Sequence, residues 1–207
     1  LSQGNSVRAI ADYGRALRLD PVNTHALFQR GLAHFERGAF AVARADFAAV
    51  LAIDPANARA LHWRANAEQD LAEQFERQLL SLSSQIAERP QDASLLNERC
   101  WLRATGGREL DKALSDCNQA LGISPRDARI LDSRGLVFLK LGDFPAALAD
   151  YEAALEIAPQ NGHFLYGRAI ALHALDRAEE AASAFEAAEA RQPGIAALYR
   201  SYGIARS

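Results

Sequence analysis

The stretch PRDARILDSRGLVFLKLGDFPAALADYEAALEIAP, residues 125–159, decides the fold. Asp127 can accept hydrogen bonds from the free N–H groups that begin a helix. Gly142 tolerates the left-handed conformation that ends one. Behind it, one helix face carries three residues spaced by four and three: Ala147, Tyr151 and Ala154. The stretch therefore predicts a hairpin of two helices.

The same pattern recurs along the whole chain, because the prolines that open each unit are separated by 34, 35, 35, 34 and 34 residues: Pro21, Pro55, Pro90, Pro125, Pro159 and Pro193. An Asn or Asp follows two residues after the first five: Asn23, Asn57, Asp92, Asp127 and Asn161. A small residue stands ten residues after each of these five prolines: Gly31, Ala65, Cys100, Gly135 and Ala169. A fixed period of this length predicts an array of stacked hairpins, each covering the apolar face of its neighbour. We therefore expect an all-α, right-handed α-solenoid.

The third unit departs from the pattern. Arg77 or Gln78 occupies the site where the second helix has a small residue elsewhere, and no Gly marks the turn. Apolar and small residues alternate by four and three from Leu61 to Ile86, so one continuous helix is conceivable. We favour two helices with a loosened turn near residues 72–74.

These columns resemble the tetratricopeptide repeat family, whose pattern has small residues at positions eight, twenty and twenty-seven, an aromatic at twenty-four and Pro at thirty-two. The resemblance covers nearly the whole chain and implies a single solenoid over 1–207. It divides the chain into the second helix of an incomplete repeat, five full repeats and a C-terminal capping helix: 1–21, 22–55, 56–90, 91–125, 126–159, 160–193 and 194–207. The C-terminal repeats also look like those of alphaproteobacterial proteins.

Composition excludes several classes of function. A net charge of -3 opposes binding to nucleic acid or to anionic membranes, which need a sustained positive field. The longest run without a charged residue has 11 residues, too short for a membrane span. Arg supplies 21 of the 23 basic residues and Ala 43 of the 207 positions, which is typical of a GC-rich bacterial genome. We expect a soluble bacterial protein, cytoplasmic or periplasmic.

No motif for catalysis occurs. The sequence lacks the nucleophile elbow, the zinc-protease motif, the phosphate loop and the dinucleotide fingerprint, so we expect no enzyme activity and no cofactor. Four histidines fall on helix positions that line the groove in this family, but they share no metal-ligand spacing: His25, His62, His163 and His173. We expect them to line the groove, with His34 in the core and no metal site.

An Arg column stands nine residues after the prolines and an Asp column nine residues before them. The residues are Arg30, Arg64, Arg99, Arg134 and Arg168, with Asp12, Asp46, Asp116 and Asp150. Both columns are equidistant from the turn between repeats, so we expect a structural ion-pair ladder rather than an anion-binding track. The predicted pairs cross repeat boundaries: Arg30 with Asp12, Arg64 with Asp46, Arg134 with Asp116 and Arg168 with Asp150. Arg99 faces Ser81 and should turn to Asp116.

We call the first helix of each hairpin its leading helix. In this family the leading helices line the concave face of the solenoid, so they should present their residues on that face to a partner. The candidates for a peptide-binding groove are Phe28, Leu32, Arg59, His62, Asn66, Asn97, Trp101, Arg129, Asp132, Leu136, Tyr166 and Ile170. Aromatic anchors among polar groups suit an extended peptide or a partner helix. We expect Trp101, in the middle of the array, to be the main anchor. The Lys and Asn positions that hold a peptide carboxylate in chaperone-binding members of the family are not matched.

The sequence therefore predicts a non-catalytic scaffold that binds another protein in its groove. The alternative is the arm of a larger enzyme or secretion component that docks its own catalytic domain. RNA binding is suggested by the period alone, and the acidic balance opposes it. The partner and the oligomeric state are not specified by the sequence.

Cys100 and Cys117 stand at the small-residue and aromatic positions of one hairpin, so both should be buried. They can form a disulfide if their Cα atoms lie about 4.4 to 6.8 Å apart. They can equally remain as free buried thiols. A bridge would favour an exported protein.

Overall fold

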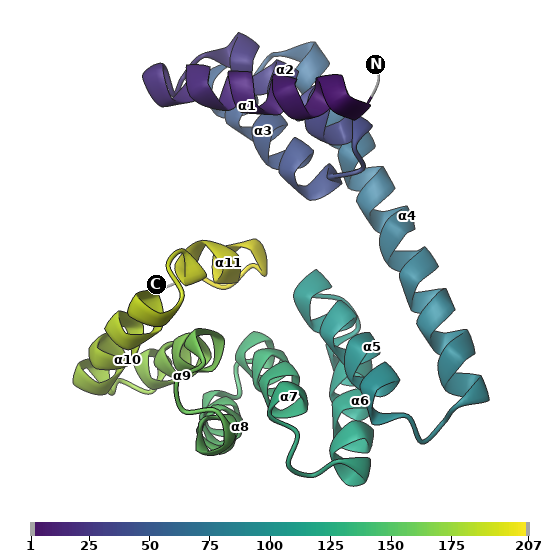
Figure 1. Ribbon diagram of the computed structural model, residues 1–207, viewed down its shortest axis with the longest axis vertical. Coiled ribbons are helices and arrows are strands. Elements are labelled where there is room, and N and C mark those ends of the chain that lie inside the picture. Colours follow the sequence, from purple (N-terminus) through teal and green to yellow (C-terminus); the bar gives the residue numbers. More distant parts are fainter. Residues whose placement is uncertain (1–2, 206–207) are drawn as a thin grey trace. The chain divides into compact units, whose positions relative to one another are not determined.

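The computed structural model describes residues 3–205 (Figure 1), and within them the chain is entirely α-helical and loop. The helices are α1 (Gln3–Leu19), α2 (Thr24–Glu36), α3 (Phe40–Ile53), α4 (Ala58–Glu88), α5 (Ala93–Gly106), α6 (Leu110–Ile123), α7 (Ala128–Leu141), α8 (Phe144–Ile157), α9 (Gly162–Ala174), α10 (Ala178–Arg191) and α11 (Ile195–Ser201). Consecutive helices pack as antiparallel hairpins, which confirms the α-solenoid class.

The chain divides into two compact units, which we call unit 1 (residues 1–77) and unit 2 (residues 78–207). Unit 1 holds α1 to α3 and the first part of α4, and unit 2 holds the last part of α4 and α5 to α11. The expectation that residues 1–207 form one solenoid stays a prediction.

The repeated Asn and Asp residues begin helices as expected. The Asn23 side chain accepts from the Ala26 N–H at 2.9 Å, and Asp92 accepts from Ser94 and Leu95. Between the helices of a hairpin, the backbone enters the left-handed region at Gly142 and at Asp176, where φ is 59°. These caps satisfy backbone groups that a helix end leaves unpaired.

Residues 58–88 form one continuous helix, α4, so the expected turn near 72–74 is wrong. The physical reason lies in the local sequence, which has no Gly, Pro or Asn between Glu68 and Glu88 to end a helix. Glu73 also bridges the expected turn, accepting from Gln69 at 3.1 Å and from Arg77 at 3.4 Å. Such i,i+4 pairs stabilise a helix that runs through this point.

The small-residue column lets the two helices of a hairpin approach closely. A Cβ added to Gly31 would lie 2.7 Å from the Phe47 ring. In unit 2 the Tyr151 ring lies between two glycines, and a Cβ would come within 3.0 Å of it at Gly135 and 2.2 Å at Gly167. Any larger side chain at these sites would displace the ring, so the contact accounts for the small residues.

Cys100 and Cys117 form a disulfide with Cα atoms 5.6 Å apart. Both cysteines are fully buried, as expected, and the bridge joins α5 to α6 at the level where other hairpins place a small residue against an aromatic ring. Of the two possibilities that the sequence left open, the structure has the bridge.

The Arg and Asp columns pair inside each hairpin and not across repeat boundaries, so most of the predicted pairs are wrong. Arg30 donates to Asp46 from Nε at 2.9 Å and from Nη2 at 2.6 Å, and Arg134 binds Asp150 in the same way at 2.8 and 2.7 Å. Both residues of such a pair stand eight positions from the glycine of their own hairpin turn. The two columns are therefore equidistant from the turn between repeats and also from the turn within a hairpin. The ion pairs form between the two helices that the turn within the hairpin joins.

The remaining members of the columns vary. Arg99 turns to Asp116 as expected, with bonds of 2.9 and 2.6 Å, and Arg103 also binds this carboxylate. The other predicted members have different partners: Asp12 pairs with Arg15, Arg64 with Glu68 at 3.6 Å, and Arg168 with Glu152 at 3.5 Å. A bidentate pair forms where an Asp faces the Arg within the hairpin and is lost where it does not.

Candidate functional site

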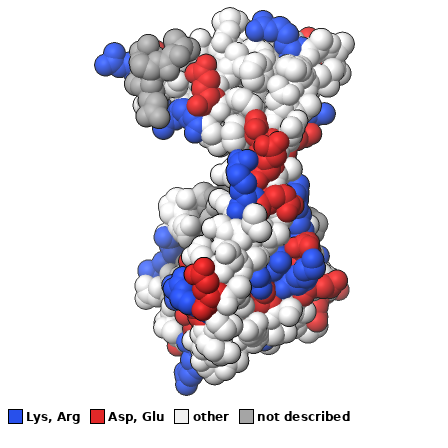
Figure 2. Space-filling model, turned by 90° about the vertical axis from the view of Figure 1, so that its right-hand side faces the viewer, with Lys and Arg blue, Asp and Glu red and all other residues white. Residues whose placement is uncertain are grey.

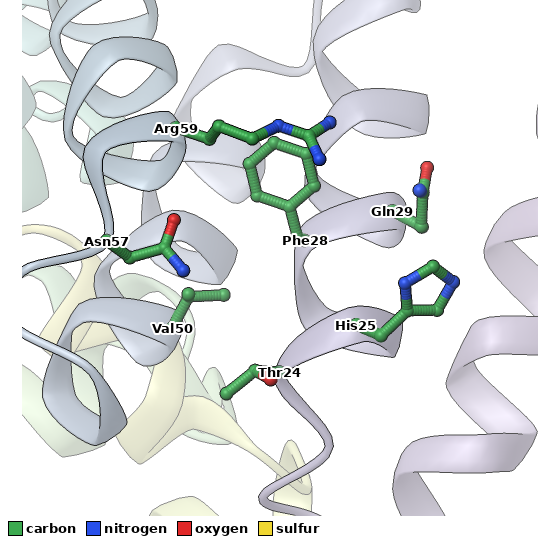
Figure 3. A pocket seen from close by; sticks show the side chains of 7 residues that line it. All are labelled: Thr24, His25, Phe28, Gln29, Val50, Asn57 and Arg59. Atoms are coloured by element: carbon green, nitrogen blue, oxygen red, sulfur yellow. The ribbon is translucent and has the colours of Figure 1, made fainter.

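A pocket of about 240 Å³ opens on unit 1 between α2, the end of α3 and the start of α4 (Figure 3). Its lining comprises Thr24, His25, Phe28, Gln29, Val50, Asn57 and Arg59. Phe28 and Arg59 are members of the predicted groove, and the structure brings them together. The first turns of two successive leading helices therefore form one recess.

Arg59 lies across the Phe28 ring, with its Cζ 4.5 Å from the ring centroid (Figure 3). This is a cation–π contact, and it keeps the guanidinium over an apolar surface. The Phe28 side chain is otherwise buried, packed on Phe47 in the core of unit 1. The buried ring thus serves as a platform for the charged side chain of Arg59.

Among the described residues that line the pocket, Arg59 is the one whose side chain is always positively charged and only donates hydrogen bonds. His25 and Gln29 project from α2 beside the ring (Figure 3), and no Asp or Glu occurs among the described residues that line the pocket. No described carboxylate lies within ion-pair distance of Arg59. Asn57 is committed to structure, because its oxygen accepts from the Ala60 N–H and its amide donates to Asp54. The pocket is therefore suited to a negatively charged or carbonyl-bearing group.

The other predicted groove residues of unit 1 lie further along the leading helices. Leu32 is half-buried against the core, and His62 is exposed. Asn66 Nδ2 lies 3.1 Å from His62 Nε2, so these two side chains hold each other on the surface of α4.

The chain's own C-terminal segment, residues 195–205, lies on part of the predicted groove of unit 2. Tyr199 of α11 packs on Tyr166 and on His163, with ring centroids 4.8 Å apart in each case. Tyr202 packs edge-on against Trp101 at 5.5 Å. The expected capping helix therefore covers the concave face as well as the end of the stack.

This covering corrects the expectation of an exposed apolar row. Leu136 is fully buried at 0% exposure, and Ile170 and Tyr166 are buried at 7% and 5%. Trp101 is half-buried and also touches His163, at 5.6 Å. Side chains that point to the concave side become core as soon as a segment lies on them.

Buried polar groups lie beneath this segment. Asp132 Oδ1 is 2.9 Å from His163 Nδ1, and the Tyr199 hydroxyl donates to the His163 carbonyl at 3.0 Å. Burial raises the pKa of Asp132 above its ordinary value, and the hydrogen bond from His163 opposes that rise. The Asp132 and His163 side chains thus join α7 to α9, and the Tyr199 hydroxyl joins α11 to α9.

The two remaining predicted members have local partners. Arg129 is exposed and donates to Asp127 at 2.9 Å, which lowers the pKa of that carboxyl. Asn97 is half-buried, with an oxygen that has no hydrogen-bond partner among the described residues. Neither side chain joins the aromatic cluster around Tyr199.

The sequence reasoning did not foresee that the C-terminal segment folds back. Tyr199 and Tyr202, spaced by three on one helix face, were the available signal. The described residues hold no group of three or more His, Cys, Asp or Glu placed to bind a metal ion. No helix within residues 3–205 is long and apolar enough to cross a membrane.

Known structures share this architecture at low identity. A tetratricopeptide repeat protein from Parabacteroides merdae is 23% identical, with a TM-score of 0.53 over 87% of this chain and 73% of that one. TTC0263, a thermophilic protein of Thermus thermophilus, is 22% identical, with a TM-score of 0.53 over 87% of this chain and 97% of that one. YrrB, described as having an unusual peptide-binding site, is 15% identical, with a TM-score of 0.53 over 91% and 97%. At these identities the likeness concerns the fold.

Sequence comparison identifies the repeats. No curated protein matches the chain. Two models of the tetratricopeptide repeat match it, one over residues 1–69 and the other over residues 133–195, which together cover most of its length. Since these models match most of the chain and its sequence pattern recurs every 34 or 35 residues, the chain belongs to the tetratricopeptide repeat family.

Proposed function

We propose that this protein is a non-catalytic scaffold that binds a segment of another protein on the concave surface of unit 1. The observation that carries the proposal is the recess around Phe28 and Arg59, an aromatic platform beneath a cation that has no described carboxylate partner. The segment it suits carries an acidic side chain next to an apolar one. The acid would pair with Arg59 while the apolar group packs beside the ring.

The rest of the molecule supports a protein partner. On the face shown in Figure 2, Lys and Arg lie next to Asp and Glu, so that face offers no extended field of one sign. In unit 2, residues 195–205 lie on part of the concave face, where Tyr199 packs on Tyr166 and Tyr202 on Trp101. YrrB shares the fold and is described as binding peptide, which favours the same class of ligand.

An array of 12-residue peptides with varied numbers of Asp, Glu and aromatic residues tests the proposal. The labelled chain should retain peptides that combine an acid with an apolar residue. Arg59→Glu should weaken this binding roughly tenfold or more, as for the loss of a central interface arginine. The control is Arg44→Glu, the same charge change on an exposed residue of α3. Equal losses in both variants would show attraction by net charge and refute the site.

A further inference from the structure

In three hairpins of this chain, the small residue of the leading helix touches one particular residue of the trailing helix, which is the second helix of the hairpin. The contacts are Gly31 with Phe47, Cys100 with Cys117, and Gly135 with Tyr151. The first member always stands ten residues after a proline, and the second stands eight residues before the next one. This contact is the centre of the hairpin interface.

In the third repeat the same two positions are Ala65 and Leu82. They lie on one helix, α4, and residues seventeen apart on an α-helix are about 25 Å apart along its axis. Ala65 is exposed and Leu82 is half-buried. The repeat therefore has both halves of a hairpin interface, and one chain with a continuous α4 cannot bring them together.

Unit 2 has a hollow where the missing leading helix would lie. In unit 2 each leading helix packs against its own trailing helix and against the next leading helix, as α5 does with α6 and α7. A pocket of about 490 Å³ lies between the last part of α4, which is the trailing helix of repeat three, and α5. It is lined by Gln78, Ser81, Leu82, Gln85, Glu98, Trp101, Leu102 and Thr105.

The leading half of α4 carries the matching face. Leu61 is 43% exposed, and Ala65 is exposed one turn further on. Pairing two α4 helices antiparallel about the midpoint between Glu73 and Gln74 sets Ala65 opposite Leu82. The same register sets Leu61 opposite Ile86, on the stripe of α4 that also carries Ala65 and Leu82.

We propose that a second copy of this chain supplies the missing helix, so that residues 58–71 of each copy pack against α5 and residues 75–88 of the other. The exchange preserves the interface that the three hairpins above make within one chain. It also keeps α4 unbroken, which a fold-back would not. A fold-back would also have to place a residue such as Ala72 or Glu73 in the left-handed conformation, which its Cβ disfavours.

A designed disulfide tests the exchange, because the equivalent pair Cys100 and Cys117 already shows that these positions can be bridged. The full chain carrying both Ala65→Cys and Leu82→Cys is oxidised at micromolar concentration and analysed on non-reducing gels. We expect a covalent dimer that reverts to 22.5 kDa chains on reduction. A covalent dimer should also form when the two single variants are unfolded, mixed and refolded together. Neither single variant should form it alone.

Light scattering of the unmodified chain between about 5 and 200 μM gives the second readout, and we expect a mass of twice 22.5 kDa at the upper end. Three results would overturn the proposal. One is a bridge formed within a monomer, since this means that α4 breaks and closes on itself. The others are no bridge at all, and a mass of 22.5 kDa at every concentration.

Discussion

Removing the Asp116 carboxylate should destabilise unit 2 more than any other change in the Arg and Asp columns. Asp116 accepts from Arg99 at 2.9 and 2.6 Å and also binds Arg103. The Asp116 and Arg103 side chains are 7% and 8% exposed, so solvent screens the pair little. Asp116→Ala leaves two guanidinium groups without this partner, one of them buried. Breaking one side of a buried pair typically costs about 3 to 5 kcal/mol.

Two other residues of the Asp column show how the expected loss of stability depends on burial and on the number of partners. Asp46 binds one guanidinium, that of Arg30, which is 27% exposed, so Asp46→Ala should cost less than Asp116→Ala. Asp12 is 61% exposed and pairs only with a neighbour on its own helix. Asp12→Ala is therefore the control, with an expected loss of about 0.5 kcal/mol or less.

Urea unfolding followed by tryptophan fluorescence measures these free energies. The two tryptophans fall in different units, Trp63 in unit 1 and Trp101 in unit 2. A Trp63→Phe background therefore reports on unit 2, for Asp116→Ala, and a Trp101→Phe background reports on unit 1, for Asp46→Ala and Asp12→Ala. Asp116→Ala should lower the midpoint without changing the slope. A loss within about 1 kcal/mol of that in Asp12→Ala would refute the claim that the buried carboxylate holds α5 to α6.

Three further changes test unit 2. Replacing Cys100 and Cys117 by Ser opens a bridge with a sequence separation of 17 and should lower the unfolding free energy by about 3 kcal/mol in the same assay. Burial raises the Asp132 pKa, so the folded state loses stability as the pH rises from 3.8 through the raised pKa. The unfolding free energy of Asp132→Asn should therefore increase relative to that of the parent as the pH is raised above 3.8. Gly167→Ala places a Cβ against Tyr151 and should lower the melting temperature, because overpacking typically reduces the unfolding free energy by about 1 to 3 kcal/mol.

The helix boundaries were predictable because local chemistry determines them. A side chain such as Asn23 caps a helix through contacts three residues away, and a glycine such as Gly142 ends one through its own φ. Neither depends on the tertiary structure. The disulfide was foreseen only as one of two possibilities, because the sequence fixes the level of Cys100 and Cys117 on their helices and not their separation.

The ion pairs were harder to predict, since a column of residues can be symmetric about two turns at once. Arg30 is nine residues from the proline before it and eight from the glycine after it. Sequence spacing gives both distances equal weight. Packing decides between them, because Gly31 lets the Phe47 ring bring the helices of one hairpin together at the level of this arginine.

Residues 58–88 show how far a repeat period can be trusted. The period reflects which residues must be in contact, and it is kept in the third repeat by Ala65 and Leu82 although the turn residues are not. A hairpin needs both its interface and its turn within one chain, whereas an interface between two chains needs no turn. Exchange between two copies would therefore permit the third repeat to lose its turn while it retains its interface. The spacing by four and three therefore correctly indicates that α4 has a face for a neighbouring helix. It does not indicate whether that helix belongs to the same chain or to a second copy.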